Sequence, residues 1–295
     1  MFPEVHFVTV FADGPGGGNP APIVVDAATM TDEEMRDVAR RSGHESGFVL
    51  PAPVGSGCDL ALRFWVPNHE MSMCGHVTVG ALWLLDRLGR LPGDEVRVFT
   101  PSGIVLGRLG GPVGRRTVEI SQPLGAVDSL ADDRVEFLLD VLGITRDDLA
   151  PAPVQNASTS RVKTLLPLAS PALLDALRPD FDRVEEACTL VDSTGLYPYA
   201  VSDPGRPVFD ARQFPRSSGY PEDAATGIAA TALVTGLLAA GRVAPNAGAV
   251  HVRQGRAMGR PSRIDVRFAR DGDAVTGLRL GGAVALADGA ERSTR

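Results

Sequence analysis

The sequence predicts an α+β protein of two pseudo-symmetric domains, each with a central helix wrapped by mixed β-sheet. The 295 residues are too many for one ordinary core and fit two domains. Short apolar segments, separated by Gly- and Pro-containing turns, occur in both halves and are typical of strands. Two apolar segments, residues 74–90 and 226–242, also align without gaps at a constant offset of 226 − 74 = 152. This alignment predicts an internal repeat.

The two aligned segments are predicted to be the central helices. They are CGHVTVGALWLLDRLGR and TGIAATALVTGLLAAGR, in which Gly75 aligns with Gly227 and Gly89 with Gly241. A helix that is apolar nearly all round is a buried helix. The second segment is too short for the roughly 20 residues of a membrane-spanning helix, so we expect no contact with a membrane.

The first half is predicted to begin with a strand that ends near Phe11, a Gly/Pro loop, and a second strand, PIVVD. A helix is expected from Thr31 to Arg41, because Thr31 and Glu34 form a capping-box pattern and Gly43 is a natural stop. The remaining predicted elements are strands in GFVLPAP and DLALRFWVP, the central helix over about residues 75–88, and β-rich structure in VRVFTPSGIVLGRL.

The second half repeats this plan after a turn or boundary predicted at residues 110–116. Its predicted elements are a strand in TVEISQP, a helix in ADDRVEFLLDVLG, strands in VKTLLPL and YPYAVS, the central helix over residues 227–240, and terminal strands. We therefore predict an N-terminal domain of residues 1–115 and a C-terminal domain of residues 116–277. Residues at about 278–290 are candidates to return to the first domain.

Composition and charge exclude several classes of protein. Hydrophobic residues make up 44% and charged residues 22%, which is ordinary for a globular protein. The net charge of −7, without a cluster of basic and aromatic residues, predicts no nucleic-acid partner. The N-terminus lacks the pattern of a signal peptide. Three cysteines without disulfide or metal-site spacing predict reduced thiols, a cytoplasmic location and no metal.

The starts of the two central helices are the predicted reactive positions. The first N–H groups of a helix have no internal partners and carry partial positive charge, so they can bind an anion. Two such starts aimed at one cleft between the domains would hold a carboxylate with backbone donors. Cys74, His76, Thr226 and the residues just before Thr226 would then be the side chains nearest to it. This arrangement suits a proton moved on a carbon near a carboxylate.

Four segments resemble the PhzF-like, or phenazine biosynthesis-like, family of the diaminopimelate epimerase fold superfamily. They are FADGPGGGNPAPIVV, GHESGFVL at residues 43–50, LRFWVPNHEMSMCGHVTVGA at residues 62–81, and RQFPRSSGYPEDAATGIAA at residues 212–230. They occur in order and span nearly the whole chain. The resemblance implies a diaminopimelate-epimerase-like fold, a homodimer, an active site between the domains and no cofactor.

The resemblance also implies roles for individual residues. Glu45 matches the proton-transferring carboxylate of the family, His76 its Gly-His histidine, and Asp223 the aspartate of its E-D-x-x-T-G motif. Without the family, Glu45 would be taken for a surface carboxylate, His76 for a core or capping histidine, and Asp223 for a helix cap. The predicted substrate-binding residues are Asn19, Gly75, Gly219, Thr226 and Gly227.

Two positions depart from phenazine-type members. Cys74 precedes the Gly-His pair, and MCGH resembles instead the catalytic-cysteine motif of proline racemases and diaminopimelate epimerases. The internal alignment puts Thr226 where those relatives have a second cysteine, so a symmetric two-thiol racemase is not expected. A catalytic Cys74, favoured as thiolate at a helix start, and a buried structural Cys74 both stay open. Ile228 stands where phenazine-type members commonly have a serine.

These observations predict a cofactor-independent isomerase that moves a proton, and so a double bond, on a small unsaturated carboxylate or cyclic amino acid. By analogy with the family, the reaction belongs to specialised-metabolite or antibiotic biosynthesis. Two alternatives stay open. One is an amino-acid epimerase or racemase that uses Cys74. The other is a non-catalytic protein that binds a small acid.

Overall fold

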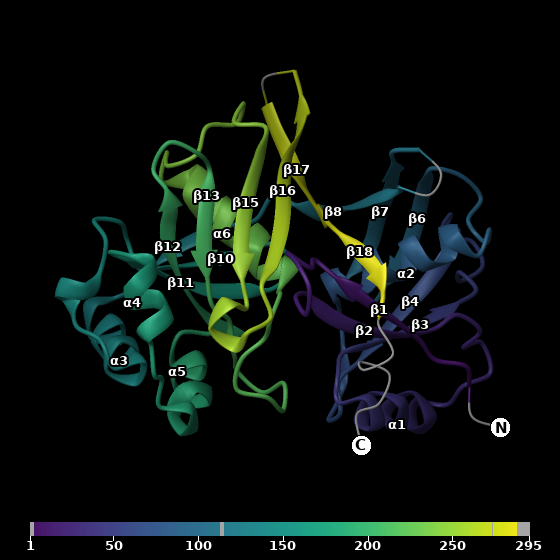
Figure 1. Ribbon diagram of the computed structural model, residues 1–295, viewed down its shortest axis with the longest axis horizontal. Helices are drawn as coiled ribbons and strands as arrows, with labels where there is room; N and C mark the ends of the chain where they lie inside the picture. Colours follow the sequence, from purple (N-terminus) through teal and green to yellow (C-terminus); the bar gives the residue numbers. More distant parts are fainter. Residues whose placement is uncertain (1–2, 113–114, 273, 288–295) are drawn as a thin grey trace. The chain divides into compact units, whose positions relative to one another are not determined.

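The computed structural model describes residues 3–112, 115–272 and 274–287. Contacts between residues divide the chain into two units (Figure 1). Unit 1 comprises Met1–Ser121 and Leu280–Arg295, and unit 2 comprises Gln122–Arg279. The chain leaves unit 1 within strand β8 (Thr117–Pro123) and returns within strand β17 (Ala274–Gly282). Positions 113–114 of the predicted turn, and positions 288–290 of the predicted return segment, lie outside the described residues.

Unit 1 contains one ordered series of paired strands. Its elements are β1 (His6–Val10), β2 (Asn19–Val24), α1 (Asp32–Ser42), β3 (Ser46–Leu50), β4 (Leu60–Trp65), β5 (Glu70–Met71), α2 (Gly75–Arg87), β6 (Glu95–Thr100), β7 (Gly103–Gly110) and β18 (Val284–Leu286). The strands pair in the order β18–β1–β2–β3–β4–β6–β7. The successive pairings are antiparallel, antiparallel, parallel, antiparallel, parallel and antiparallel.

Unit 2 repeats this series. Its elements are β9 (Val127–Ser129), α3 (Asp132–Leu142), η1 (Arg146–Asp148), β10 (Gln155–Ser158), β11 (Val162–Leu168), α4 (Pro171–Ala176), η2 (Phe181–Arg183), α5 (Val184–Leu190), β12 (Gly195–Asp203), β13 (Val208–Ala211), β14 (Phe214–Pro215), α6 (Gly227–Ala239), β15 (Ala249–Gln254), η3 (Arg256–Met258) and β16 (Ser262–Asp271). The order β9–β10–β11–β12–β13–β15–β16 has the same sequence of antiparallel and parallel pairings as unit 1.

The predicted repeat is confirmed by the two central helices. Helices α2 and α6 each have 13 residues, and α6 begins 227 − 75 = 152 positions after α2. Their ends are also alike. Gly89 and Gly241 adopt φ of 66° and 64°, the left-handed conformation that glycine tolerates at a helix end. The next N–H in each, of Arg90 or Arg242, donates to a carbonyl five residues back, at 2.9 and 2.8 Å respectively.

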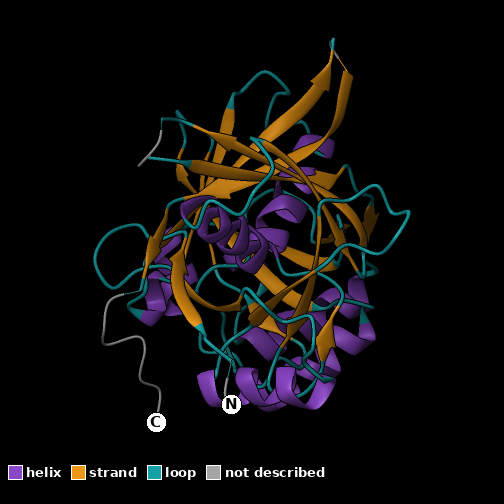
Figure 2. Ribbon diagram, turned by 90° about the vertical axis from the view of Figure 1, so that its right-hand side faces the viewer, coloured by secondary structure: helices purple, strands orange, loops and turns teal. Residues whose placement is uncertain are grey.

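Each central helix is enclosed by the strands of its own unit (Figures 1 and 2). Helix α2 contacts β1, β2, β3, β7 and β18, and α6 contacts β9, β10, β11 and β16. Small residues permit this close packing. A Cβ added at Gly80 of α2 would lie 2.8 Å from Val8 Cγ2, and one added at Gly236 of α6 would lie 2.5 Å from Leu165 Cδ1. In the described part of the chain no helix has both the length and the apolar character that crossing a membrane requires.

The structure confirms the predicted capping box and corrects one boundary. Thr31 N–H donates to Glu34 Oε2 at 2.8 Å, and Glu34 N–H donates to Thr31 Oγ1 at 3.3 Å. The second strand begins at Asn19 rather than at Pro22. Pro20 and Pro22 lack an N–H but do not prevent pairing. The other backbone groups of this strand still pair with β1 on one side and β3 on the other.

Candidate active site

Glu45 lies in a tight turn between α1 and β3. The turn begins at Gly43, which has φ 67° and donates its N–H to Ala39 O at 2.9 Å. The buried hydroxyls of Ser42 and Ser46 stabilise this turn. Ser42 Oγ donates to Val38 O at 2.8 Å and lies 3.2 Å from Ser46 Oγ. These contacts fix the backbone on both sides of Glu45, whose residue exposure is only 9%.

Cys74 and His76 lie at the start of α2. Cys74 is the residue before the first helical turn, with φ −137° and ψ 111°, and its side chain forms no cap with the helix. Its carbonyl instead accepts from Thr78 N–H at 3.1 Å and Thr78 Oγ1 at 2.7 Å. The thiol is therefore not used as a helix cap. His76, the second helical residue, is 2% exposed.

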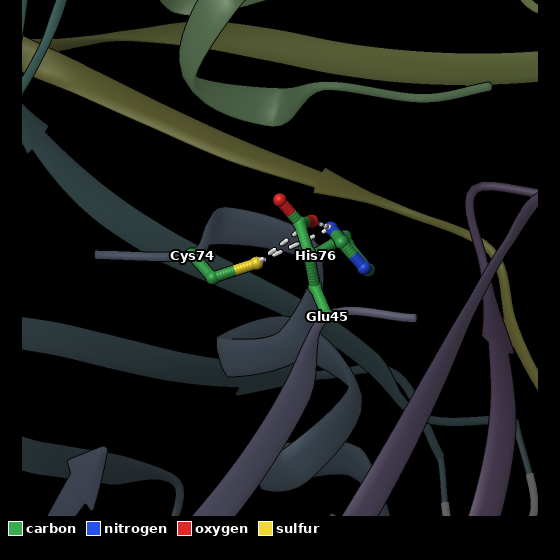
Figure 3. A group of neighbouring side chains, drawn as sticks. All are labelled: Glu45, Cys74 and His76. Carbon is green, nitrogen blue, oxygen red and sulfur yellow. Dashed lines mark hydrogen bonds and ion pairs between the residues drawn. The ribbon is translucent and has the colours of Figure 1, made fainter. Parts of the chain in front are cut away.

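These three side chains converge on one point (Figure 3). Cys74 Sγ donates to Glu45 Oε2 at 3.4 Å and lies 3.4 Å from His76 Nδ1. His76 Nδ1 lies 3.3 Å from the same Glu45 oxygen. Positions 45, 74 and 76, predicted from motifs far apart in the sequence, are thus brought into direct contact by the fold.

The arrangement constrains the protons on the three groups. An ionised carboxylate can only accept hydrogen bonds, so Glu45 next to Nδ1 favours the histidine tautomer that carries its proton on Nδ1. His76 Nε2 is then an acceptor, and it is buried without a hydrogen-bond partner among the described residues. The start of α2, with its unpaired N–H groups and partial positive charge, lies beside this cluster. The cluster can therefore accept, hold and return a proton.

A second cluster of polar side chains surrounds the start of α6 in unit 2. Thr226 Oγ1 donates to Asp223 Oδ2 in a short hydrogen bond. Gln254 Nε2 donates to Asp223 O at 2.7 Å, and Gln254 Oε1 accepts from Thr226 N–H at 3.3 Å and from Tyr197 Oη at 2.9 Å. Complete burial, and to a smaller extent the negative charge of Asp223, raises the pKa of Tyr197 well above its ordinary value. The Tyr197 hydroxyl therefore keeps its proton and remains a donor.

A buried ion pair anchors the segment that carries Asp223. Arg212 donates through Nε to Glu222 Oε1 at 2.9 Å and through Nη2 to Glu222 Oε2 at 2.7 Å. Both side chains are about nine-tenths buried, each 8% exposed. Arg212 Nη1 also donates to the carbonyls of Leu174 and Leu177 at the end of α4. This bidentate pair restrains residues 212–222 and thereby the position of Asp223.

The other predicted substrate-binding residues have distinct settings. Gly75 and Gly227 are the first residues of α2 and α6, as predicted. Asn19 is buried at the first position of β2, and Gly219 adopts φ 86° in the loop before α6. Sequence reasoning missed Gln254 and Tyr197, because no motif links β15 or β12 to the start of α6. That the side chains at the start of α2 and those at the start of α6 share one cleft stays a prediction.

Comparisons with known proteins agree with this architecture. The chain is 14% identical to a hydroxyproline epimerase from Agrobacterium vitis, with a TM-score of 0.66 over 96% of this chain and 90% of the other, a likeness that shows the fold alone. The fold is therefore the two-part, diaminopimelate-epimerase-like α+β fold. The structure of a Bacillus anthracis phenazine biosynthesis protein of the PhzF family is nearer, with 25% identity, a TM-score of 0.83 and 96% coverage of both chains.

Residues 8–289 match the family model described as phenazine biosynthesis-like protein, and the chain belongs to this family. A relative from Deinococcus radiodurans, named an uncharacterized isomerase, is 32% identical over 95% of this chain and 91% of its own length. The trans-2,3-dihydro-3-hydroxyanthranilate isomerase of Pseudomonas aeruginosa is 30% identical, with 96% coverage of both chains. The chain is accordingly an enzyme of the isomerase class.

Proposed function

We propose that this protein is a cofactor-independent isomerase that shifts a double bond in a small unsaturated carboxylate by moving one proton. The observation that carries the proposal is the buried contact of Glu45 with His76 and Cys74 at the start of α2. A carboxylate held in this way is positioned to exchange a proton with carbon. The nearby helix N-terminus supplies donors for the substrate carboxylate.

The proton transfer in this proposal has two balanced steps. Glu45 takes a proton from a carbon next to a double bond or carboxylate, and the electron pair of the broken C–H bond enters the conjugated system. The carboxylic acid of Glu45, directly or through His76, then returns a proton to a different carbon. The double bond has moved, and the enzyme regains its starting protonation. Asp223 and Thr226 are proposed to contribute to substrate binding from unit 2.

The proposed substrate class is supported by the relatives and by the residue at position 228. The named Pseudomonas aeruginosa relative isomerises trans-2,3-dihydro-3-hydroxyanthranilate, an unsaturated cyclic amino acid. We propose a related substrate, and a role in specialised-metabolite biosynthesis, for this chain. Ile228, the second residue of α6, is 3% exposed and apolar, so its side chain offers no hydrogen bond to a substrate. We therefore expect a substrate with a less polar substituent at the place that Ile228 contacts.

The contact of the Cys74 thiol with Glu45 bears on the epimerase alternative, because it puts a second acid–base side chain beside the proposed one. Inversion at a single carbon by two groups requires them on opposite faces of that carbon. Cys74 Sγ and Glu45 Oε2 lie 3.4 Å apart, which leaves no room for a carbon between them. Cys74 and Glu45 are therefore not a pair that could invert one carbon between them, whereas one of them alone can remove a proton from one carbon and return it to another.

The test of the proposed function is proton NMR in D₂O with trans-2,3-dihydro-3-hydroxyanthranilate and a panel of unsaturated and saturated cyclic amino acids. Wild type is expected to shift a double bond with deuterium incorporated at carbon. Glu45→Gln is expected to lose about 10²- to 10⁴-fold in rate, the usual contribution of a general acid–base group. Glu33→Gln, at an exposed site in α1, is the matched control.

Each other outcome separates the alternatives. Deuterium exchange with inversion at one carbon, and no double-bond shift, would support the epimerase. Saturable ligand stabilisation without exchange in either protein would support the non-catalytic binding protein. A Glu45→Gln variant with wild-type rate would contradict the proposed role of Glu45.

A further inference from the structure

We propose that Glu45, Cys74 and His76 form a three-ligand binding site for a zinc-like divalent cation, whose occupation blocks proton transfer. The cation in this proposal is an inhibitor rather than a cofactor. Only the inhibitory consequence rests on the proposed function, since binding itself follows from the donor atoms and their geometry. Within the described ranges, this is the one group of three or more His, Cys, Asp or Glu side chains with ligand atoms close enough to share an ion.

The distances between the three ligand atoms fit a tetrahedral metal. Zinc bonds of about 2.0 Å to oxygen, 2.05 Å to nitrogen and 2.3 Å to sulfur place tetrahedral neighbours about 3.3 Å apart for O···N, and about 3.5–3.6 Å apart for pairs with sulfur. The observed separations are 3.3 Å for Glu45 Oε2 to His76 Nδ1, and 3.4 Å from Cys74 Sγ to each of them. The ion would therefore need movements of only about 0.2 Å.

The donor set selects the class of cation. Thiolate and imidazole prefer zinc and related ions, whereas magnesium and calcium prefer oxygen ligands. One thiolate, one carboxylate and one neutral imidazole together balance the double positive charge. We therefore expect binding of Zn²⁺ and Co²⁺, but not of Mg²⁺.

The surroundings make this an exchangeable site rather than a permanent one. Three protein ligands leave a fourth position open, as in sites where zinc keeps a water. In zinc proteins the second ring nitrogen of a histidine ligand normally has a hydrogen-bond partner, and loss of such partners typically costs about 10- to 100-fold in affinity. His76 Nε2 has none among the described residues. A chelator is therefore expected to remove the metal completely.

Binding also changes the protonation of the cluster. The Cys74 thiol must lose its proton to solvent, and the imidazole must move its proton from Nδ1 to Nε2 so that Nδ1 can ligate the ion. With Glu45 ionised, one proton is released to solvent for each ion bound. The ion would occupy the Glu45 oxygen that is proposed to take the substrate proton, which is why turnover should stop.

The experiment is a titration of the chelator-treated full chain with Co²⁺, followed by absorption spectroscopy. One equivalent is expected to produce a thiolate-to-cobalt charge-transfer band and the intense visible bands of four-coordinate cobalt, and Zn²⁺ should displace both. Cys74→Ser should abolish the charge-transfer band, and His76→Gln, which removes the imidazole ligand, should weaken binding. The matched control is Cys58→Ser, because Cys58 is a partly exposed thiol outside the cluster. Circular dichroism verifies that each variant is folded.

The proposal is overturned if no thiolate band forms, or if the band persists in Cys74→Ser. X-ray absorption of the zinc-loaded chain gives a second test, with one sulfur and two protein nitrogen or oxygen neighbours expected. Cobalt bands without isomerase activity on any substrate would uphold the metal site and count against the proposed function. Activity that is lost with Glu45→Gln but insensitive to saturating Zn²⁺ would uphold the function and overturn the inhibition.

Discussion

At the residue scale, the double-bond-shift and epimerase hypotheses differ in the role that they give to Cys74. Its thiol donates to Glu45, and a serine hydroxyl can donate in the same way. For a double-bond shift carried by Glu45, Cys74→Ser is expected to keep the rate within about fivefold. An epimerase with Cys74 as an acid–base group would lose about 10²-fold or more. Single-turnover NMR with Cys58→Ser as control distinguishes the two results.

Cys188 is a residue with a predicted effect on stability. It is fully buried, and burial raises the pKa of its thiol to about 11 from an ordinary value of 9.0. The unfolded chain then loses the thiol proton at lower pH than the folded chain. The free energy of unfolding should therefore fall between pH 9 and 11, by at most about 1.4 kcal/mol per pH unit from this group.

Denaturant unfolding at pH 8 and pH 10 measures this effect of Cys188. The variant Cys188→Ala, compared with itself at the two pH values, should show a smaller decrease than wild type. Cys58→Ser should retain the wild-type decrease, because Cys58 is not fully buried. Equal decreases in wild type and Cys188→Ala would assign the pH dependence to other groups.

At the scale of elements, the close approach of β3 to α2 positions Glu45. Gly47, two residues after Glu45, lies so near α2 that an added Cβ would overlap Val77 Cγ1. Val77 is fully buried and β-branched, so its χ1 rotation is restricted and it has little freedom to move aside. Gly47→Ala is expected to destabilise the protein by about 1–3 kcal/mol and to lower activity by displacing Glu45.

The double variant Gly47→Ala/Val77→Ala tests that mechanism, because removal of the valine methyl groups relieves the overlap. Thermal unfolding should show the double variant less destabilised than the sum of the single variants, by at least about 0.5 kcal/mol. Additive effects would mean that the two side chains do not compete for the same space.

At the scale of the whole molecule, the chain completes unit 1 with its last described strand. Strand β18 pairs with β1 through Val8↔Leu286, Thr9↔Ala285 and Val10↔Val284. Two further hydrogen bonds extend this pairing, Phe11 N–H to Ala283 O at 2.6 Å and Ala287 N–H to Phe7 O at 3.0 Å. Unit 1 therefore depends on residues that follow all of unit 2 in the sequence.

Truncation tests this dependence. A chain that ends at Gly282 lacks β18, and hydrogen exchange of the β1 amides is expected to be at least about tenfold faster than in a chain that ends at Ala287. The amides of α6 in unit 2 should differ much less between the two chains. An equal loss of protection in β1 and α6 would show that the units do not open separately. The homodimer and the cytoplasmic location stay predictions.

The sequence by itself determined the elements and the reactive residue types. The offset of 152 identifies both central helices, because burial on all sides demands apolar residues throughout, and such a pattern is visible locally. The capping box at Thr31 and the glycine ends of the helices are likewise local signals. The sequence motifs identified Glu45, Cys74, His76 and Asp223 as candidate catalytic residues, but they did not predict which of these side chains touch one another.

Only the tertiary structure decided how these residues meet. Glu45 contacts Cys74, 29 positions away, because the Gly43 turn and the β3–α2 packing bring them together. Gln254 of β15 bonds to Thr226, 28 positions away, and Tyr197 of β12 bonds to Gln254, 57 positions away. Such contacts leave no periodic signal in one sequence, since they depend on strand order and on the close approach of whole elements. The same convergence supplies the three side chains of the proposed cation site, which sequence spacing did not indicate.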